Sequence, residues 1–106
     1  MMDSRIWGSL GLCSKAGKLI FGVPMIIEAM QKGKKVFLVI EAQDTSDNTH
    51  KKITDKCNFY GVKKIRLDVD GGVLASYVGK SSSLAAVAIT DESFYQMVSK
   101  NIVDNQ

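Results

Sequence analysis

Apolar residues near the start of the chain repeat at helical spacing. Ile6, Leu10 and Cys13 follow one another at intervals of four and three residues, as on one face of an α-helix. Ser4 stands where an N-cap would lie, and Gly17 is placed to end the helix in a left-handed conformation. The pattern therefore predicts a first helix between Ser4 and Gly17.

A short strand and a second helix are predicted next. Residues 18–21 form a brief, mostly apolar segment that fits a strand, and Gly22 then allows a tight turn. Pro24 suits the first turn of a helix, where its missing N–H costs nothing, and Gly33 marks the helix end. The apolar face of this predicted helix consists of Met25, Ile26, Ala29 and Met30.

The middle of the chain contains the strongest strand signal. Residues 36–40 are an uninterrupted run of β-branched, aromatic and aliphatic side chains, which favours a central strand covered on both faces. A polar loop over residues 43–47 follows, and its Ser46 or Asp47 can cap a third helix that ends at Gly61. The inner side of that helix is predicted to carry Ile53, Cys57 and Tyr60.

The last third of the chain predicts two more strands and two more helices. Residues 64–67 alternate between polar and apolar, as an edge or half-buried strand does, and residues 70–72 turn into a short apolar helix over 73–78. Residues 85–89 are small and apolar, which predicts a buried strand. Asp91 can cap a final helix, whose apolar residues are Phe94, Met97, Val98 and Ile102.

Five helices alternating with about four short strands predict an α/β fold. We expect a three-layer α/β/α sandwich around a small mixed sheet, in one domain that spans residues 1–106. No apolar run approaches the roughly 18 residues that cross a bilayer, and residues 1–5 do not resemble a signal peptide. We therefore expect a cytoplasmic protein with no membrane partner.

Cysteine and charge refine this expectation. Cys13 and Cys57 are too far apart to form a metal-ligand pair and too few to form a disulfide framework, so free buried thiols are expected. The net charge of +3 is unevenly spread, because residues 1–66 carry +6 and residues 67–106 carry −3. A basic excess in one part of the chain suggests a polyanionic partner, although a solvated lysine surface explains it equally.

The sequence contains no recognisable catalytic site. The glycines near the N-terminus lack the spacing of a dinucleotide fingerprint, and His50 is expected on an exposed helix surface because only one acid shares its face. Asp68 and Asp70 are interpreted as part of an acidic turn and not as a cation-binding site. No enzyme activity, cofactor, metal or small-molecule substrate is therefore expected.

Two loops are more informative when they are considered together. Residues 15–18 contain Lys15 and Lys18 and precede the turn at Gly22, where free N–H groups at a helix start favour a phosphate. Residues 80–83 combine one cation, Lys80, with three hydroxyl groups. If both loops lie at one edge of the sheet, they form a compact site for an RNA backbone. Either loop alone is better explained as a solvated surface.

The chain also resembles a known family in several ordered segments. They are residues 10–22 (LGLCSKAGKLIFG), 39–49 (VIEAQDTSDNT), 51–58 (KKITDKCN) and 74–89. In this order and spacing, they resemble the ribosomal proteins of the L-seven-Ae and L-thirty-e type, which bind kink-turn RNA. The resemblance covers roughly residues 4–103.

This resemblance implies a three-layer α/β/α domain without catalytic activity and an RNA surface made of two parts. The turn entering the second helix would read the base pairs of a kink-turn, and the loop before the last strand would pack on an extruded nucleotide. Carried over by position, the first part consists of Lys18, Gly22, Val23, Pro24 and Met25, and the second of Lys80, Ser81, Ser82 and Ser83.

The turn departs from the family pattern at Pro24 and Met25, where strong kink-turn binders have Asn and Glu, and at Glu28, where they have Lys. Neither Pro nor Met can make comparable hydrogen bonds to a base edge. We therefore carry two hypotheses. The first is a monomeric module that binds structured RNA, including ribosomal RNA, through the surface above together with Lys15. The alternative is a protein-interaction scaffold of the same fold that has lost specific RNA recognition.

Overall fold

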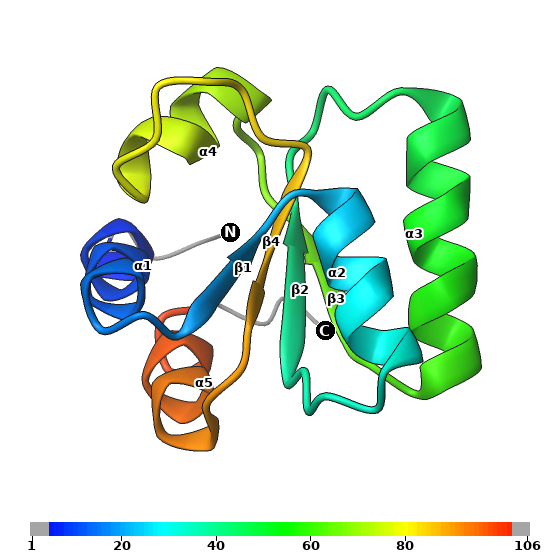
Figure 1. Ribbon diagram of the computed structural model, residues 1–106. Coiled ribbons are helices and arrows are strands. Elements are labelled where there is room, and N and C mark those ends of the chain that lie inside the picture. The colour runs from blue at the N-terminus through cyan, green and yellow to red at the C-terminus, as the bar shows by residue number, and fades with distance from the viewer. Residues whose placement is uncertain (1–4, 103–106) are drawn as a thin grey trace.

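The computed structural model of the protein describes residues 5–102 and contains the predicted alternation of helices and strands (Figure 1). The expected N-cap Ser4 lies outside these residues. The helices are α1 (Arg5–Lys15), α2 (Val23–Gln31), α3 (Asp47–Tyr60), α4 (Gly71–Tyr77) and α5 (Glu92–Ser99). The strands are β1 (Leu19–Phe21), β2 (Leu38–Glu41), β3 (Lys64–Arg66) and β4 (Ala86–Ile89).

The four strands form one mixed sheet in the order β1-β4-β2-β3. β4 runs antiparallel to both of its neighbours, whereas β2 and β3 run parallel. The two central strands, β2 and β4, are buried along their whole length, as their apolar sequences predict. β3 is an edge strand with half-buried residues, which confirms the reading of its alternating pattern.

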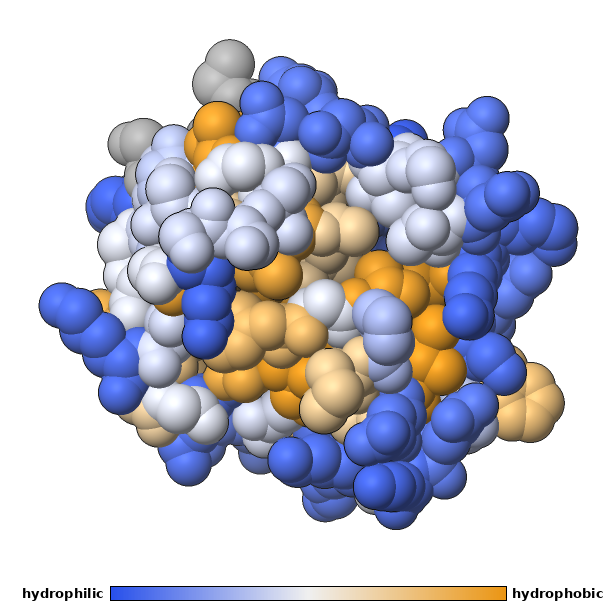
Figure 2. Space-filling view, turned by 45° about the horizontal axis from the view of Figure 1, so that its top comes forward, coloured by the Kyte–Doolittle hydropathy of each residue, from blue (hydrophilic) through white to orange (hydrophobic). Residues whose placement is uncertain are grey.

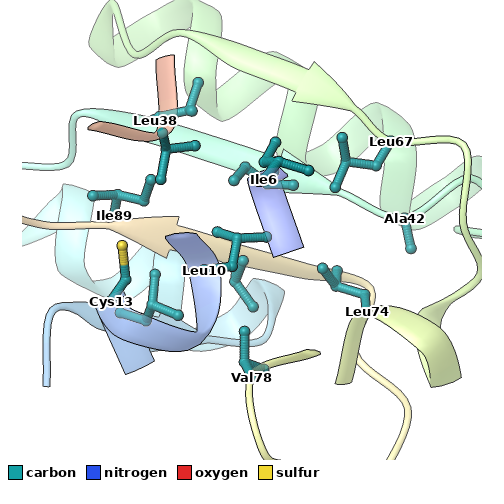
Figure 3. Packing of buried hydrophobic residues seen from close by; sticks show 13 residues of the cluster. Ile6, Leu10, Cys13, Leu38, Ala42, Leu67, Leu74, Val78 and Ile89 are labelled. Atoms are coloured by element: carbon teal, nitrogen blue, oxygen red, sulfur yellow. The ribbon is translucent and has the colours of Figure 1, made fainter. Parts of the chain in front are cut away.

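Helices cover both faces of the sheet and give the predicted three layers. α1, α4 and α5 lie on one side of it, and α2 and α3 lie on the other (Figure 1). Each side has its own apolar core cluster. In the first cluster, Ile6, Leu10 and Cys13 of α1 gather with Leu38 and Ile89 of the central strands (Figure 3).

The residues predicted to begin and end the helices do so in the structure. Ser46 Oγ accepts a hydrogen bond from Thr49 N (3.3 Å), and Asp91 Oδ1 accepts one from Phe94 N (3.1 Å). Gly61 ends α3 with φ 69°, a left-handed conformation that suits glycine. α4 begins at Gly71, two residues earlier than predicted, because Asp70 Oδ1 already accepts from Val73 N (2.8 Å) and so caps the helix.

Three sequence predictions need correction. The strand predicted over residues 36–40 begins only at Leu38, although Phe37 N still donates to Ile89 O (2.8 Å). Tyr60 is 38% exposed because it is the last residue of α3, at the border of the core. The final helix was predicted to include Ile102, but α5 ends at Ser99, so Ile102 packs against the core cluster from the segment that follows the helix.

None of the helices in the described part of the chain is both long and apolar enough to cross a membrane.

Candidate functional site

The strand register brings two of the candidate segments to the same end of the sheet. Phe21, the last residue of β1, pairs with Val87 near the start of β4, and Gly22 N donates to Ala86 O (2.9 Å). The turn that enters α2 therefore lies beside the loop that precedes β4, at the top of Figure 1. Figure 2 turns this end toward the reader and shows apolar surface in its middle, with hydrophilic residues around it.

The first segment is the turn from β1 into α2. Gly22 adopts φ 88° and ψ 146° and occupies the N-cap position without a side-chain hydrogen bond. A side chain would strain this left-handed conformation, so the turn depends on glycine. Val23 is buried, whereas Pro24 and Met25 are exposed at the helix start.

Met25 was expected in the core, but 54% of it is exposed. The buried face of α2 is instead formed by Val23, Ile26, Ile27, Ala29 and Met30. Because consecutive helical residues are about 100° apart, a face centred on Ile26, Ile27 and Met30 leaves Met25 at the solvent boundary. The exposed thioether is thus free to contact a partner.

The second segment is the loop between α4 and β4. Lys80, Ser81, Ser82 and Ser83 are all exposed. Its far end is fixed on the buried Gly71, whose carbonyl accepts from Leu84 N (3.0 Å). A Cβ at Gly71 would collide with Ser83 Oγ and would lie 2.7 Å from Leu84 O. Gly71 therefore positions the loop, a role that the sequence indicated only as a turn at two adjacent glycines.

Lys80 is held at the meeting point of these segments. Its Nζ lies 4.4 Å from the centroid of the Phe21 ring, within the range of a cation–π contact. Phe21 directly precedes the Gly22 turn. The contact thus places a positive charge beside the turn into α2.

The two lysines of the first predicted loop lie apart from one another. The carbonyl of Lys18 accepts from Thr90 N (3.0 Å), so the Lys18 backbone lies at the opposite end of β1 from Gly22. Lys15 instead lines a groove of about 660 Å³ between α1 and α4, together with Phe21 and Lys80. The structure therefore brings the turn at Gly22 beside Lys80 and the start of β4, with Lys15 across the adjoining groove and Lys18 at the other end of β1.

The same end of the sheet contains a charged cluster that sequence reasoning missed. Glu41 is fully buried at the end of β2, where it pairs in register with Ala86 of β4. Its carboxylate accepts from Lys64 Nζ (2.6 Å) and contacts His50 Nδ1 (2.7 Å). Arg66 Nε lies 3.9 Å from the same carboxylate. We had expected His50 to be a free histidine on the helix surface, and this prediction was wrong.

Burial alone would raise the pKa of Glu41. The hydrogen bonds from Lys64 and His50, and the charges of these groups, outweigh burial and lower the pKa below its ordinary value. Glu41 is consequently an ionised structural group and not a proton donor. The only sequence signal for it is an acidic residue that directly ends an apolar strand.

The two cysteines offer no reactive thiol. Both are buried and free, as predicted. Burial raises the pKa of each thiol to about 11, so almost none of either is ionised at neutral pH.

Comparison with known proteins places this arrangement among related sequences. Residues 5–99 match the Ribosomal protein L7Ae/L30e/S12e/Gadd45 family. The RNA-binding protein YlxQ of Bacillus subtilis (strain 168) is 36% identical over 85 residues, which cover 80% of this chain and 82% of that protein. The RNA-binding protein YlxQ of Enterococcus faecium is 42% identical over 53 residues, which are 50% of each chain.

Two solved structures share the fold. A protein of unknown function from Bacillus halodurans C superposes with a TM-score of 0.82 at 26% identity, covering 92% of this chain and 96% of that one. The Giardia lamblia 15.5kD RNA binding protein has a TM-score of 0.73 and covers 91% of this chain and 80% of its own. Its 16% identity shows likeness of fold alone.

Proposed function

Because the chain belongs to the ribosomal protein L7Ae/L30e/S12e/Gadd45 family, we propose that it binds structured RNA of the kink-turn kind and catalyses no reaction. The RNA-binding protein YlxQ of Bacillus subtilis, at 36% identity over most of both chains, supports RNA as the partner. In this proposal the chain acts in the cytoplasm as one monomeric domain, associated with the ribosome or another structured RNA.

One observation carries the proposal: the hydrogen bond from Gly22 N to Ala86 O (2.9 Å) joins the turn into α2 to the start of β4. The turn that the family resemblance assigns to RNA therefore lies next to the strand that follows the 80–83 loop, which supports a single surface made of both segments. Gly22 has no side chain to keep a backbone away, and Lys80 supplies a positive charge for a phosphate. The exposed hydroxyls of Ser81, Ser82 and Ser83 can donate to phosphate or ribose oxygens.

The turn itself favours recognition of shape over recognition of base edges. Pro24 and Met25 present no side-chain donor or acceptor comparable to an amide, so sequence reading by bidentate hydrogen bonds is absent from these two positions. The exposed Met25 can pack on the flat face of a base instead. We thus expect preference for a kinked RNA with little discrimination between base sequences.

The test compares a kink-turn RNA with a straight duplex of equal length at about 0.15 M salt. Binding measured by fluorescence anisotropy should be about tenfold tighter or more for the kinked RNA. Replacing one phosphate-contacting lysine should reduce the magnitude of the negative slope of log K against log salt by about 0.9. We expect that loss for Lys80→Gln and not for the matched control Lys100→Gln, whose exposed side chain follows α5.

Equal, weak binding to both RNAs that disappears with added salt would show a nonspecific basic surface and contradict the proposal. No binding to either RNA would favour the scaffold alternative, which the exposed apolar turn at Pro24 and Met25 supports.

A further inference from the structure

A second groove lies at the other end of the sheet from Gly22 and the 80–83 loop. It has a volume of about 380 Å³ and runs between the segment that follows α2 and the end of α3. These two segments lie side by side at the bottom of Figure 1. The groove is lined by Lys34, Lys35, Phe37, Tyr60 and Val62, among others.

The rim of this groove carries exposed lysines that form no ion pair with any other residue among 5–102. Lys34 and Lys35 are exposed, and within residues 5–102 neither has a carboxylate within 4.0 Å. Lys63 at the same end is also exposed and equally without such a partner among the described residues. Lys32 differs, because it pairs with Glu28 (3.3 Å). Unpaired lysines around a groove favour an anionic ligand.

Tyr60 lines the groove together with these lysines, and the ring of Phe59 packs against it. Phe59 is 79% exposed, and Tyr60 is 38% exposed. The two rings meet edge to face, with centroids 4.9 Å apart and planes at 84°. Exposed aromatic rings beside lysines are the combination with which proteins bind single-stranded nucleic acid, because bases stack on the rings while the cations follow the phosphates.

The groove is connected to the proposed RNA surface along α2. A smaller hollow of about 190 Å³ is lined by Met25 at one end of α2 and by Lys32 and Lys34 at the other. Glu28 lies between them, and its charge is offset by its ion pair with Lys32 (3.3 Å). The nine residues of α2 span about 14 Å, which corresponds to about four stacked nucleotides at roughly 3.4 Å each. A strand that leaves the Met25 end can therefore reach Lys34 by a short path.

We propose that the groove at Lys34, Lys35 and Tyr60 is a second RNA-contact surface, which holds a single-stranded segment flanking the structured RNA. Lys34 and Lys35 neutralise its phosphates, and Phe59 and Tyr60 stack on its bases. The inference rests on the proposed function for the RNA that anchors the first surface. The charge of the rim is what favours RNA here over an apolar protein partner.

The experiment measures the affinity of two RNAs that share a kink-turn core, one of which carries an eight-nucleotide single-stranded extension. Wild-type protein should bind the extended RNA at least about fivefold more tightly, the gain expected from one stacked base. The double variant Lys34→Gln, Lys35→Gln should remove this gain. For the extended RNA, it should also reduce the magnitude of the slope of log K against log salt by about 1.4, since each phosphate contact on a single strand contributes about 0.7. Phe59→Ala should also reduce the gain. Because the Phe59 side chain is exposed, its removal leaves the core intact.

The matched control is Lys52→Gln with Lys100→Gln, which removes the same charge from two exposed lysines outside the groove that form no ion pair among the described residues. An equal loss in this control, or no gain from the extension in the wild type, would overturn the inference. So would an unchanged RNA affinity in the Lys34→Gln, Lys35→Gln variant, which would point to a protein partner instead.

A free 12-nucleotide single strand separates this inference from the proposed function. Its addition should shift amide NMR signals of residues 33–37 and 59–63. If these shifts occur while the kink-turn core does not bind, the proposed function fails and the second surface stands. If the core binds and the single strand shifts no signal in these segments, only the second surface is contradicted.

Discussion

Glu41 shows how one buried charge can organise the end of a sheet. Its carboxylate is fully buried, and it joins His50 of α3 with Lys64 and Arg66 of β3. Lys64 is itself largely buried, with a side chain only 14% exposed. Removing one partner of such a pair leaves the other charge buried and uncompensated, which is strongly destabilising.

We predict that Glu41→Gln lowers the free energy of unfolding by about 3 kcal/mol at pH 7, measured by urea denaturation. The matched control is Glu28→Gln, which removes an exposed carboxylate paired with Lys32. Exposed pairs contribute about 0.5 kcal/mol or less, so the control should be almost as stable as the wild type. Similar losses in both variants would contradict a structural role specific to Glu41.

The same carboxylate predicts a dependence of stability on pH. Its pKa is lowered in the folded state, so its contribution is complete above the unfolded value of about 4.3 and is lost as pH falls through the folded value. The difference in stability between wild type and Glu41→Gln should therefore shrink when denaturation is repeated below about pH 4. A difference that stays constant down to pH 2 would rule out this linkage.

The identity of Glu41 as a buried ion-pair partner could not be read from the sequence. A glutamate after five apolar residues is equally consistent with a strand that has emerged into solvent. His50, Lys64 and Arg66 lie 9, 23 and 25 positions away, and only the parallel pairing of β2 with β3 brings the last two beside it. Met25 and Tyr60 were misplaced for a related reason, since periodicity gives a helical face but not where the core ends.

At the scale of elements, the sequence predicted existence and order well because several local signals agreed. The third helix had a capping serine at Ser46, a buried stripe at Ile53 and Cys57, and a terminating glycine at Gly61, and all of these act as expected. The contacts between elements could not be predicted from the sequence. The sequence could not show that the loop before β4 is fixed on the first residue of α4, because that contact depends on tertiary packing.

This contact predicts that Gly71→Ala destabilises the protein by about 2 kcal/mol, the usual cost of overpacking, because the new methyl group would meet Ser83 and Leu84. It should also displace the 80–83 loop and weaken RNA binding. Thermal unfolding and RNA anisotropy measure the two effects. Gly8→Ala is the control: nothing lies within 4 Å of its added Cβ, and alanine in a helix should stabilise by about 0.5–1 kcal/mol. Unchanged stability in Gly71→Ala would show that the loop moves freely at this point.

At the scale of the whole molecule, the sheet separates two cores that each contain one cysteine. Cys13 belongs to the cluster under α1, α4 and α5, and Cys57 to the cluster under α2 and α3. Both thiols are buried with pKa values raised to about 11. Each is therefore a probe for the opening of its own layer.

If the layers unfold cooperatively, both thiols should react with a disulfide reagent at the same rate, at least about 10³-fold more slowly than in the unfolded chain. Mass spectrometry of partly modified protein measures the two sites separately, and Cys13→Ala and Cys57→Ala variants provide the single-site controls. Faster reaction at one cysteine would show that its layer opens on its own.

The length of α2 also affects how tightly RNA can bind when it contacts both ends of this helix weakly. It is a rigid segment of about 14 Å between Met25 and the lysines that follow it. An RNA anchored at one end of this helix offers its flanking strand to the other end at an effective concentration in the millimolar range. A second contact with a dissociation constant of about 1 mM would then be occupied about half of the time. The second contact can therefore compensate, through avidity, for the base-edge hydrogen bonds that Pro24 and Met25 cannot make.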